Sequence, residues 1–217
     1  MIAATTLEKH GIQVQGARVA IQGFGNVGRF AALSCHNLGF KVIAISDITG
    51  GILDRKGLDI PQIMKYRSIA EVGKYEKITS QEVLQQKCEV LIPAALGGVI
   101  NELNVSKINC DFVIEGANQP TTFEADKELR GAGVVIVPDI LANSGGVMGS
   151  YFEWTQNIQQ FSWPIERFRK ELDDRMAKSF KDVYEEARKY DIDYRTAAFV
   201  LAVRRVAGAF ALRGALV

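Results

Sequence analysis

Short apolar runs alternate with amphipathic stretches along the first two thirds of the chain. Between them, residues 26–38, 57–67 and 121–133 carry apolar positions at helical spacing. Buried strands that alternate with helices predict an α/β fold of the Rossmann type, a doubly wound and mainly parallel sheet covered on both faces. The apolar runs that predict the strands are residues 17–23, 41–47, 88–94, 111–117 and 134–139.

From about Val147 the pattern predicts helices only. Apolar residues recur every three or four positions over residues 164–190, and residues 194–212 form a second, more apolar helix that we expect to be well buried. We therefore expect one domain, with an α/β core over residues 12–146 and a helical C-terminal cover over 147–217. Residues 1–10 have the features of the end of a helix without its N-terminal cap, so we expect a piece of a longer protein.

Composition excludes several classes of protein. The net charge is +1, from 26 basic and 25 acidic residues, which gives no broad attraction to nucleic acid or to a membrane surface. No apolar run reaches the ~18 residues that a membrane span needs. Three separated cysteines and two histidines favour reduced thiols in a cytoplasmic protein and predict no metal site; they are Cys35, Cys88, Cys110, His10 and His36.

The stretch GFGNVG at residues 23–28 carries the Gly-x-Gly-x-x-Gly spacing directly after a predicted strand and at the start of a predicted helix. In that context Gly23 permits a sharp turn, Gly25 lets a pyrophosphate approach the backbone, and Gly28 lets the helix pack close to the sheet. The free N–H groups of the helix start would face the phosphates. The alternative is a glycine turn that binds nothing.

Asp47 ends the next predicted strand, about 20 residues after the last glycine, where a carboxylate accepts hydrogen bonds from the adenosine ribose. A carboxylate there repels a 2′-phosphate, so NAD is favoured over NADP. NADP stays open because Arg55 and Lys56 are close in sequence and could fold back toward the site.

Three further loops follow predicted strands and are rich in small and polar residues: PAALGGVI (93–100), EGANQPTT (115–122) and VPDILANSGGVMGSYFEW (137–154). Open α/β sheets bind ligands where parallel strands end, so these loops predict one shared groove with the glycine stretch. The alternative is a set of ordinary turns and helix caps, such as a helix start at Thr121 or Thr122.

These loops, with SDITGGILDRKGLD (46–59) and TAAFVLAVRRVAGAFALRG (196–214), resemble the glutamate dehydrogenase family, which includes the leucine, phenylalanine and valine enzymes. The resemblance covers nearly the whole chain and is to the family's C-terminal NAD(P)-binding domain, on the glutamate side. It implies cofactor contacts along the chain and a substrate contact from Ser150 to the side-chain carboxylate of glutamate. The implied cofactor residues are Gly23, Gly25, Asn26, Val27, Gly28, Asp47, Ile48, Ala94, Ala95, Leu96, Asn118 and Asn143.

Two loops depart from the family's pattern. Gly97 and Gly98 stand where a polar residue and a larger one are expected, which would loosen the loop beside the cofactor. Met148 and Gly149 stand near Ser150 where small or β-branched residues are usual.

The resemblance implies oxidative deamination of L-glutamate to 2-oxoglutarate and ammonia, with catalytic and carboxylate-binding lysines in a separate preceding domain. The chain has no glycine-rich lysine loop for that role, so we predict that it contains no catalytic residue. We expect the chain alone to bind the cofactor but not to turn over glutamate. Glu115 and Asp139 are weak catalytic candidates at strand ends.

The resemblance also implies a homohexamer for the full-length protein. We expect this chain alone to be a monomer or weak dimer, with an apolar face of its first helix exposed. Two alternatives stay open: a stand-alone NAD-sensing or scaffold protein, and a dehydrogenase of another amino acid.

Overall fold

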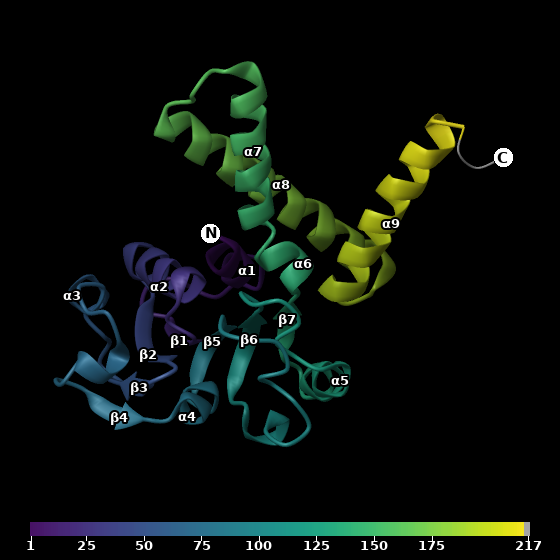
Figure 1. The fold of residues 1–217 in the computed structure, drawn as a ribbon. Coiled ribbons are helices and arrows are strands. Elements are labelled where there is room, and N and C mark those ends of the chain that lie inside the picture. The colour runs from purple at the N-terminus through teal and green to yellow at the C-terminus, as the bar shows by residue number, and fades with distance from the viewer. Residues whose placement is uncertain (215–217) are drawn as a thin grey trace. The chain divides into compact units, whose positions relative to one another are not determined.

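The computed structural model describes residues 1–214, which divide into two compact units at the Asn143–Ser144 junction (Figure 1). The first unit holds a seven-stranded sheet within the described residues. Its strands are β1 (Arg18–Gln22), β2 (Lys41–Asp47), β3 (Gly50–Leu53), β4 (Glu76–Ile78), β5 (Cys88–Pro93), β6 (Cys110–Ile114) and β7 (Val135–Val137). Its helices are α1 (Ile2–Lys9), α2 (Asn26–Asn37), α3 (Ile60–Ile63), α4 (Ser80–Leu84), α5 (Phe123–Gly131) and α6 (Asp139–Ala142), with 3-10 turns η1 (Ile69–Glu71) and η2 (Val105–Lys107).

The sheet confirms the predicted Rossmann-type, mainly parallel architecture. Its strand order is β4-β3-β2-β1-β5-β6-β7. β1, β2, β5, β6 and β7 are parallel to their neighbours in the series, whereas β3 runs antiparallel to both β2 and β4. The chain leaves β1 toward β2 on one side and later returns to β5 on the other. β1 therefore marks the topological switch point, where open α/β sheets bind ligands.

Helices cover both faces of the sheet, because consecutive residues of β1 point to opposite sides. Ala20 belongs to the buried cluster that includes Val83 and Leu84 of α4. Ile21 lies against Gly28 of α2. Figure 1 shows α2 and α4 on opposite sides of the strands, as the alternating pattern predicts.

Besides the two 3-10 turns, four elements have no counterpart in the predicted set: β3, β4, α4 and α6. β3 has four residues and begins with two glycines, and β4 is a three-residue edge strand with an exposed start, so neither carries a strong apolar signal. α4 has only five residues, but its capping box is visible in the sequence TSQE. The Thr79 hydroxyl accepts from the Glu82 N–H (3.1 Å), and the Glu82 carboxylate accepts from the Thr79 N–H (2.6 Å).

The helix predicted over residues 57–67 is much shorter in the structure. Asp59 caps α3 by accepting from the Gln62 N–H (3.1 Å), and the helix ends at Ile63. The Arg29 guanidinium donates to the carbonyls of Met64 and Tyr66. These two carbonyls follow the end of α3 and are bonded by a side chain that is distant in the sequence.

The second unit consists of helices: α7 (Gly145–Gln159), α8 (Ile165–Tyr190) and α9 (Tyr194–Leu212). Phe152 of α7 is buried, and its ring centre lies 5.4 Å from that of Trp163 and 5.6 Å from that of Phe168. α8 and α9 are joined by the ion pairs Glu186–Arg204 (2.7 Å) and Asp182–Arg205 (2.6 Å).

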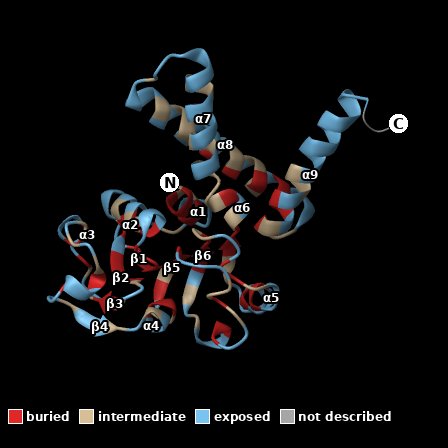
Figure 2. Ribbon diagram, in the orientation of Figure 1, coloured by how far each residue is buried: buried red, intermediate tan, exposed pale blue. Residues whose placement is uncertain are grey.

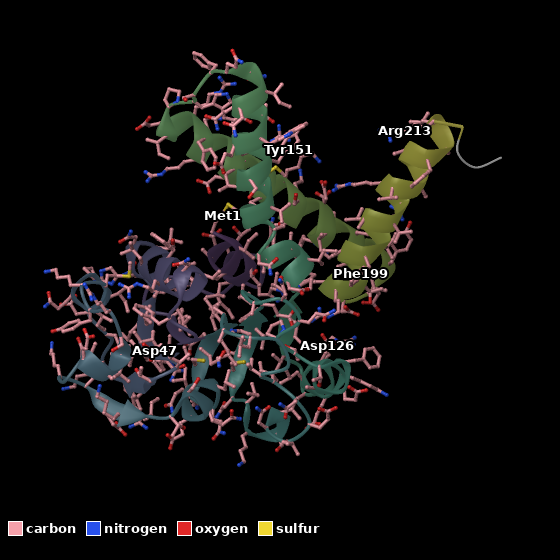
Figure 3. All side chains as sticks on the ribbon, in the orientation of Figure 1. Met1, Asp47, Asp126, Tyr151, Phe199 and Arg213 are labelled. Carbon is pink, nitrogen blue, oxygen red and sulfur yellow. The ribbon has the colours of Figure 1, made fainter. Side chains whose placement is uncertain are left out.

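The expectation that α9 is well buried is wrong. Only residues of its first turns are buried, namely Tyr194, Ala197 and Ala198. Its later apolar side chains recur at helical spacing but are exposed, and a second exposed stripe follows α7 (Figure 2). Periodicity identifies an apolar face, yet burial also needs a surface that covers it, and residues 1–214 supply none here. The stripes are Phe199, Val203, Val206 and Phe210 on α9, and Val147, Tyr151, Trp154 and Ile158 on α7; Tyr151 and Phe199 are labelled in Figure 3.

The expectation of an exposed apolar face on α1 is also wrong. Ile2, Ala3, Ala4 and Leu7 are buried, with Leu7 fully so. The His10 ring that follows lies edge-on to Phe112 of β6, with ring centres 5.2 Å apart. α1 is therefore part of the first unit's core.

Among the described residues, no helix is both long and apolar enough to cross a membrane.

Candidate functional site

The glycine stretch forms the turn between β1 and α2, and two of its glycines are required by their surroundings. Gly23 has φ +100°, and a Cβ there would lie 2.7–2.8 Å from backbone atoms of Ala94 and Ala95. A Cβ on Gly28 would lie 1.7 Å from the Gly23 carbonyl oxygen. These contacts confirm the predicted sharp turn and close helix packing.

Gly25 is different, because a Cβ there would meet nothing within 4 Å and its φ of −76° suits any residue. It is the N-cap of α2, and no side chain caps this helix start. The first N–H groups of a helix have no partner within the helix. Gly25, Asn26 and Val27 are exposed, so this end presents open space and backbone donors to the solvent.

The register of the strands brings the predicted loops to one edge. Gln22 of β1 stands opposite Ser46 of β2 and Pro93 of β5, so the turn at Gly23 begins beside Asp47 and Ala94. Ala94 is buried at the base of its loop, whereas Ala95 and Leu96 are exposed, as are Gly25 and Ile48. The candidate contacts from β1, β2 and β5 therefore share one surface of the first unit.

The two loops after β6 and β7 join the same edge. The N–H groups of Gly116 and Ala117 donate to the Pro93 carbonyl (3.0 and 2.9 Å). The Asn143 amide donates to the Asn118 side-chain oxygen (2.8 Å). The structure thus pairs two of the cofactor residues that the resemblance implies, which are 25 residues apart in the sequence.

Gly97 and Gly98 fix this loop rather than loosen it. The Gly98 N–H donates to the Gln119 carbonyl (2.9 Å), and Gly98 has φ +67°. A Cβ on Gly97 would lie 3.2 Å from the Asn118 carbonyl oxygen. The two glycines therefore allow a close contact between the loop after β5 and the loop after β6.

Asp47 is held by three donors of its own chain. Its Oδ1 accepts from the N–H (2.7 Å) and the hydroxyl (2.5 Å) of Thr49, and its Oδ2 accepts from the Ile69 N–H (2.8 Å). The Thr49 hydroxyl also accepts from the Ala70 N–H (3.1 Å). The carboxylate thus anchors η1 to the end of β2 while it remains partly exposed at the edge (Figure 3 labels Asp47). Sequence spacing identified Asp47 but not this anchoring, because Ile69 lies 22 residues away.

Arg55 and Lys56 do not reach the site. β3 runs antiparallel to β2, so the turn after it returns to the start of β2: the Asp54 N–H donates to the Ile43 carbonyl (2.8 Å) and the Leu58 N–H to the Val42 carbonyl (2.8 Å). Ile43 lies four residues before Asp47 along β2, which is about 13 Å. These two cations are therefore at the wrong end of the strand for a 2′-phosphate beside Asp47.

The carboxylates of Glu115 and Asp139 accept hydrogen bonds from backbone N–H groups of the loops. Glu115 is fully buried and its carboxylate accepts from the Asp139 N–H (2.9 Å). The Asp139 carboxylate accepts from the N–H groups of Gln119 and Ile140 (2.8 Å each). Both carboxylates thus hold the β6 and β7 loops in place, which is the structural alternative to a catalytic role.

Glu115→Ala should lower the free energy of unfolding by about 2–4 kcal/mol, because it takes the acceptor from the Asp139 N–H and opens a cavity at a fully buried position. Glu115→Gln keeps an acceptor oxygen and should cost less than half as much. Urea unfolding of the three proteins measures this. An alanine variant as stable as the original would contradict the anchoring role.

Ser150 belongs to the second unit, on α7. Its hydroxyl donates to the Gly146 carbonyl one turn earlier (3.2 Å), and the residue is exposed. A Cβ on the neighbouring Gly149 would lie 3.4 Å from the Phe168 ring, which is ordinary contact, so a small residue there would also fit.

The cysteines are free thiols in the described part of the chain. Burial raises the pKa of Cys35 to about 11 and that of Cys88 to about 12, and it also raises the pKa of Cys110. These thiols are therefore protonated at neutral pH and poor nucleophiles. Residues 1–214 contain no group of three or more His, Cys, Asp or Glu side chains that could hold a metal ion.

The first unit is thus a Rossmann-type α/β unit with a glycine turn at its switch point. The family model of the glutamate/leucine/phenylalanine/valine dehydrogenases matches residues 1–214, and the chain belongs to this family.

Two relatives are each 45% identical to the chain. A glutamate dehydrogenase of Thermotoga maritima matches over 98% of this chain and 52% of its own length. A cryptic catabolic NAD-specific glutamate dehydrogenase, GudB, of Bacillus subtilis matches over 95% of this chain and 49% of its own length. The chain therefore spans about half the length of these relatives.

Solved structures agree with this fold. A hetero-hexameric glutamate dehydrogenase of Thermus thermophilus superposes with a TM-score of 0.91 at 31% identity, over 98% of this chain and 51% of its own. The glutamate dehydrogenase of Peptoniphilus asaccharolyticus gives a TM-score of 0.83 at 33% identity, over the same shares of the two chains.

Proposed function

We propose that the chain is the NAD(P)-binding part of a glutamate dehydrogenase and that its first unit binds the dinucleotide along the carboxyl edge of the sheet. The observation that carries the proposal is the β1–α2 turn. Gly23 and Gly28 are fixed by close backbone contacts, whereas Gly25 leaves open space at an uncapped helix start. A pyrophosphate needs both that space and those N–H donors.

The other residues of the edge have assigned roles in this proposal. Gly25, Asn26 and Val27 hold the pyrophosphate, and Asp47 with Ile48 meets the adenosine ribose. Ala94, Ala95 and Leu96 line the middle of the cofactor, and Asn118 and Asn143, which bond to each other, orient the nicotinamide end. Ser150 of the second unit binds the side-chain carboxylate of glutamate.

A bound nicotinamide would supply the hydride acceptor for oxidation of the glutamate amine to an imine, with loss of a proton, and water would then hydrolyse the imine to 2-oxoglutarate and ammonia. The residues of this chain bind and orient the cofactor. Glu115 and Asp139 already bond to loop N–H groups, so neither is proposed as the acid or base. Because the chain spans about half the length of its relatives, we assign the activity to a longer protein.

Calorimetric titration of the 217-residue chain with NAD tests the binding claim, and we expect weak but saturable binding. An assay with glutamate and NAD should show no turnover by this chain alone. Robust turnover would overturn the assignment of catalytic groups to another part of the protein. A failure to bind either NAD or NADP at millimolar concentration would overturn the binding claim.

Assembly and location form part of the same proposal. A full-length homohexamer is supported by the likeness to the Thermus thermophilus protein, which is described as hetero-hexameric. The exposed apolar stripes of α7 and α9 supply surfaces that association would cover. The buried, protonated thiols suit a reducing compartment, and we propose the cytoplasm.

A further inference from the structure

Asp139, the first residue of α6, bonds to the backbone beside both asparagines of the Asn118–Asn143 pair. Its carboxylate accepts from the Gln119 N–H (2.8 Å), which belongs to the peptide group that links Asn118 to Gln119. Its backbone carbonyl accepts from the Asn143 N–H (3.0 Å). One residue therefore fixes the main chain at both ends of the hydrogen bond between the two asparagine side chains (2.8 Å).

The main chain at Gln119 depends on such support. Gln119 has φ +45°, in the left-handed region that a residue with a side chain seldom adopts. A conformation of this kind costs free energy and persists only where surrounding contacts hold it. The Gln119 N–H is held by Asp139, and its carbonyl accepts from the Gly98 N–H (2.9 Å). The direction in which the neighbouring Asn118 side chain leaves the backbone therefore depends on Asp139.

Asp139 is in turn fixed by the core of the first unit. Its N–H donates to the carboxylate of Glu115 (2.9 Å), which is fully buried directly after β6. Its own Oδ1 accepts from the Ile140 N–H (2.8 Å). Both carboxylate oxygens of Asp139 thus bond to backbone N–H groups, and hydrogen bonds to a charged acceptor are stronger than those between neutral groups. Asp139 therefore links the buried end of the sheet to the asparagine pair.

The asparagine pair keeps hydrogen-bonding capacity for a ligand. In the described part of the chain, the Asn143 amide uses one of its two N–H donors for Asn118, so the second is available. The proposed function places the nicotinamide end of the cofactor here. That end carries a carboxamide and two ribose hydroxyls, which bond well only to amides that are already oriented. The orientation of the pair should therefore set how firmly this end is held.

We propose that Asp139 is a positioning residue for the nicotinamide end of the cofactor, acting through Asn118 and Asn143 without touching the cofactor itself. This proposal rests on the proposed function, because it requires the nicotinamide end to lie at the asparagine pair. It also goes beyond it: a residue outside the cofactor contacts controls the affinity for one half of the dinucleotide. The contacts of the other half, at the ends of β1 and β2, are independent of Asp139.

Calorimetric titration of the chain with NADH and with ADP-ribose tests this, using Asp139→Ala as the variant. ADP-ribose has the adenosine and pyrophosphate of NADH but no nicotinamide, so its affinity reports on the other contacts alone. The ratio of the ADP-ribose Kd to the NADH Kd should exceed one in the original chain and fall toward one in the variant. We expect a fall of roughly 2- to 10-fold for each neutral hydrogen bond lost at the nicotinamide end.

The fluorescence of the reduced nicotinamide gives a second measurement on the same samples. In the original chain we expect the emission of bound NADH to differ from that of free NADH, because the ring is held in place. With Asp139→Ala the emission at saturation should return toward that of free NADH. A loss of stability alone would not change the emission of NADH that is still bound.

Two further variants control for effects on folding. Asp59→Ala is the matched control: the Asp59 carboxylate also accepts an N–H at a helix start, from Gln62 of α3 (3.1 Å). It follows Leu58, which bonds to the start of β2, so its loss should leave the ratio unchanged. Asp139→Asn keeps an acceptor oxygen and should keep part of the ratio. It replaces the alanine variant if circular dichroism shows that alanine prevents folding.

A double variant tests whether Asp139 acts through Asn118. Asp139→Ala should change the ratio much less in a chain that already carries Asn118→Ala, because effects of residues that act through one another are not additive. The same change in both backgrounds would show that Asp139 acts independently of Asn118 and would overturn the proposal.

The remaining outcomes distinguish this proposal from the proposed function. An equal loss of NADH and ADP-ribose affinity in Asp139→Ala would make Asp139 a general support of the fold and overturn the positioning role. Equal affinities of the original chain for NADH and ADP-ribose would also overturn it, while dinucleotide binding at the β1–α2 turn would stand. Binding of neither ligand by the original chain would overturn the proposed function, and this proposal with it.

Discussion

Gly28→Ala should be the most destabilising single methyl addition in the first unit. The new Cβ would lie 1.7 Å from the Gly23 carbonyl oxygen and 2.8 Å from its carbon. Because these are backbone atoms, relief requires α2 to move away from β1 or the turn to open, and either change breaks packing against Ile21. Forced overpacking costs about 1–3 kcal/mol where flexible side chains yield, so we expect at least ~3 kcal/mol here. Urea unfolding followed by circular dichroism measures the change.

Gly208→Ala is the matched control for that substitution. Gly208 lies inside α9, and a Cβ there would meet nothing within 4 Å. The same added methyl should therefore stabilise its helix by up to about 1 kcal/mol, because alanine has the higher helix propensity. If Gly28→Ala unfolded at the same urea concentration as the original protein, the close contact between helix and turn would be refuted.

The parts of the fold and site that sequence predicts are those set by neighbours in the chain. Gly23, Gly28 and Asp47 are recognisable because a strand, a turn and a helix follow one another within a few residues. Glycine is the residue type that the turn at Gly23 and the close helix packing at Gly28 require. The core strands are recognisable because each is a continuous apolar run between polar ends. These features depend on local conformation and burial alone.

The parts that sequence does not predict depend on contacts between distant residues. The turn that ends α3 is fixed by Arg29, and η1 is held by Asp47 on one side and by Lys77 on the other. β3 and β4 are too short to show a periodic pattern, so the position of Lys77 follows only from the sheet register. The spacing of the apolar positions in α9 predicts a helix with an apolar face, but it does not tell whether a surface covers that face, and in residues 1–214 the face is exposed.

Gly25→Val should abolish most dinucleotide binding while it leaves the fold intact. The added side chain would meet no protein atom within 4 Å at its Cβ, and φ of −76° is allowed for valine. The space it fills is the approach to the N–H groups at the start of α2, where the pyrophosphate is proposed to lie. Loss of two such hydrogen bonds to a charged group corresponds to a Kd at least about 100-fold higher for NAD. Calorimetry on the purified variant measures the affinity.

The free energy of unfolding of Gly25→Val shows whether weaker NAD binding comes from a blocked site or from an unfolded protein. Valine is a poorer N-cap than glycine, so the free energy of unfolding should fall by no more than ~1 kcal/mol, far less than for Gly28→Ala. Gly131→Val is the matched control: its Cβ also meets nothing within 4 Å, but it lies at the end of α5, before the start of β7 and away from the carboxyl edge. It should bind NAD as the original chain does. Unchanged NAD affinity in Gly25→Val would show that the pyrophosphate does not approach this turn, since nothing else in the structure depends on the missing side chain.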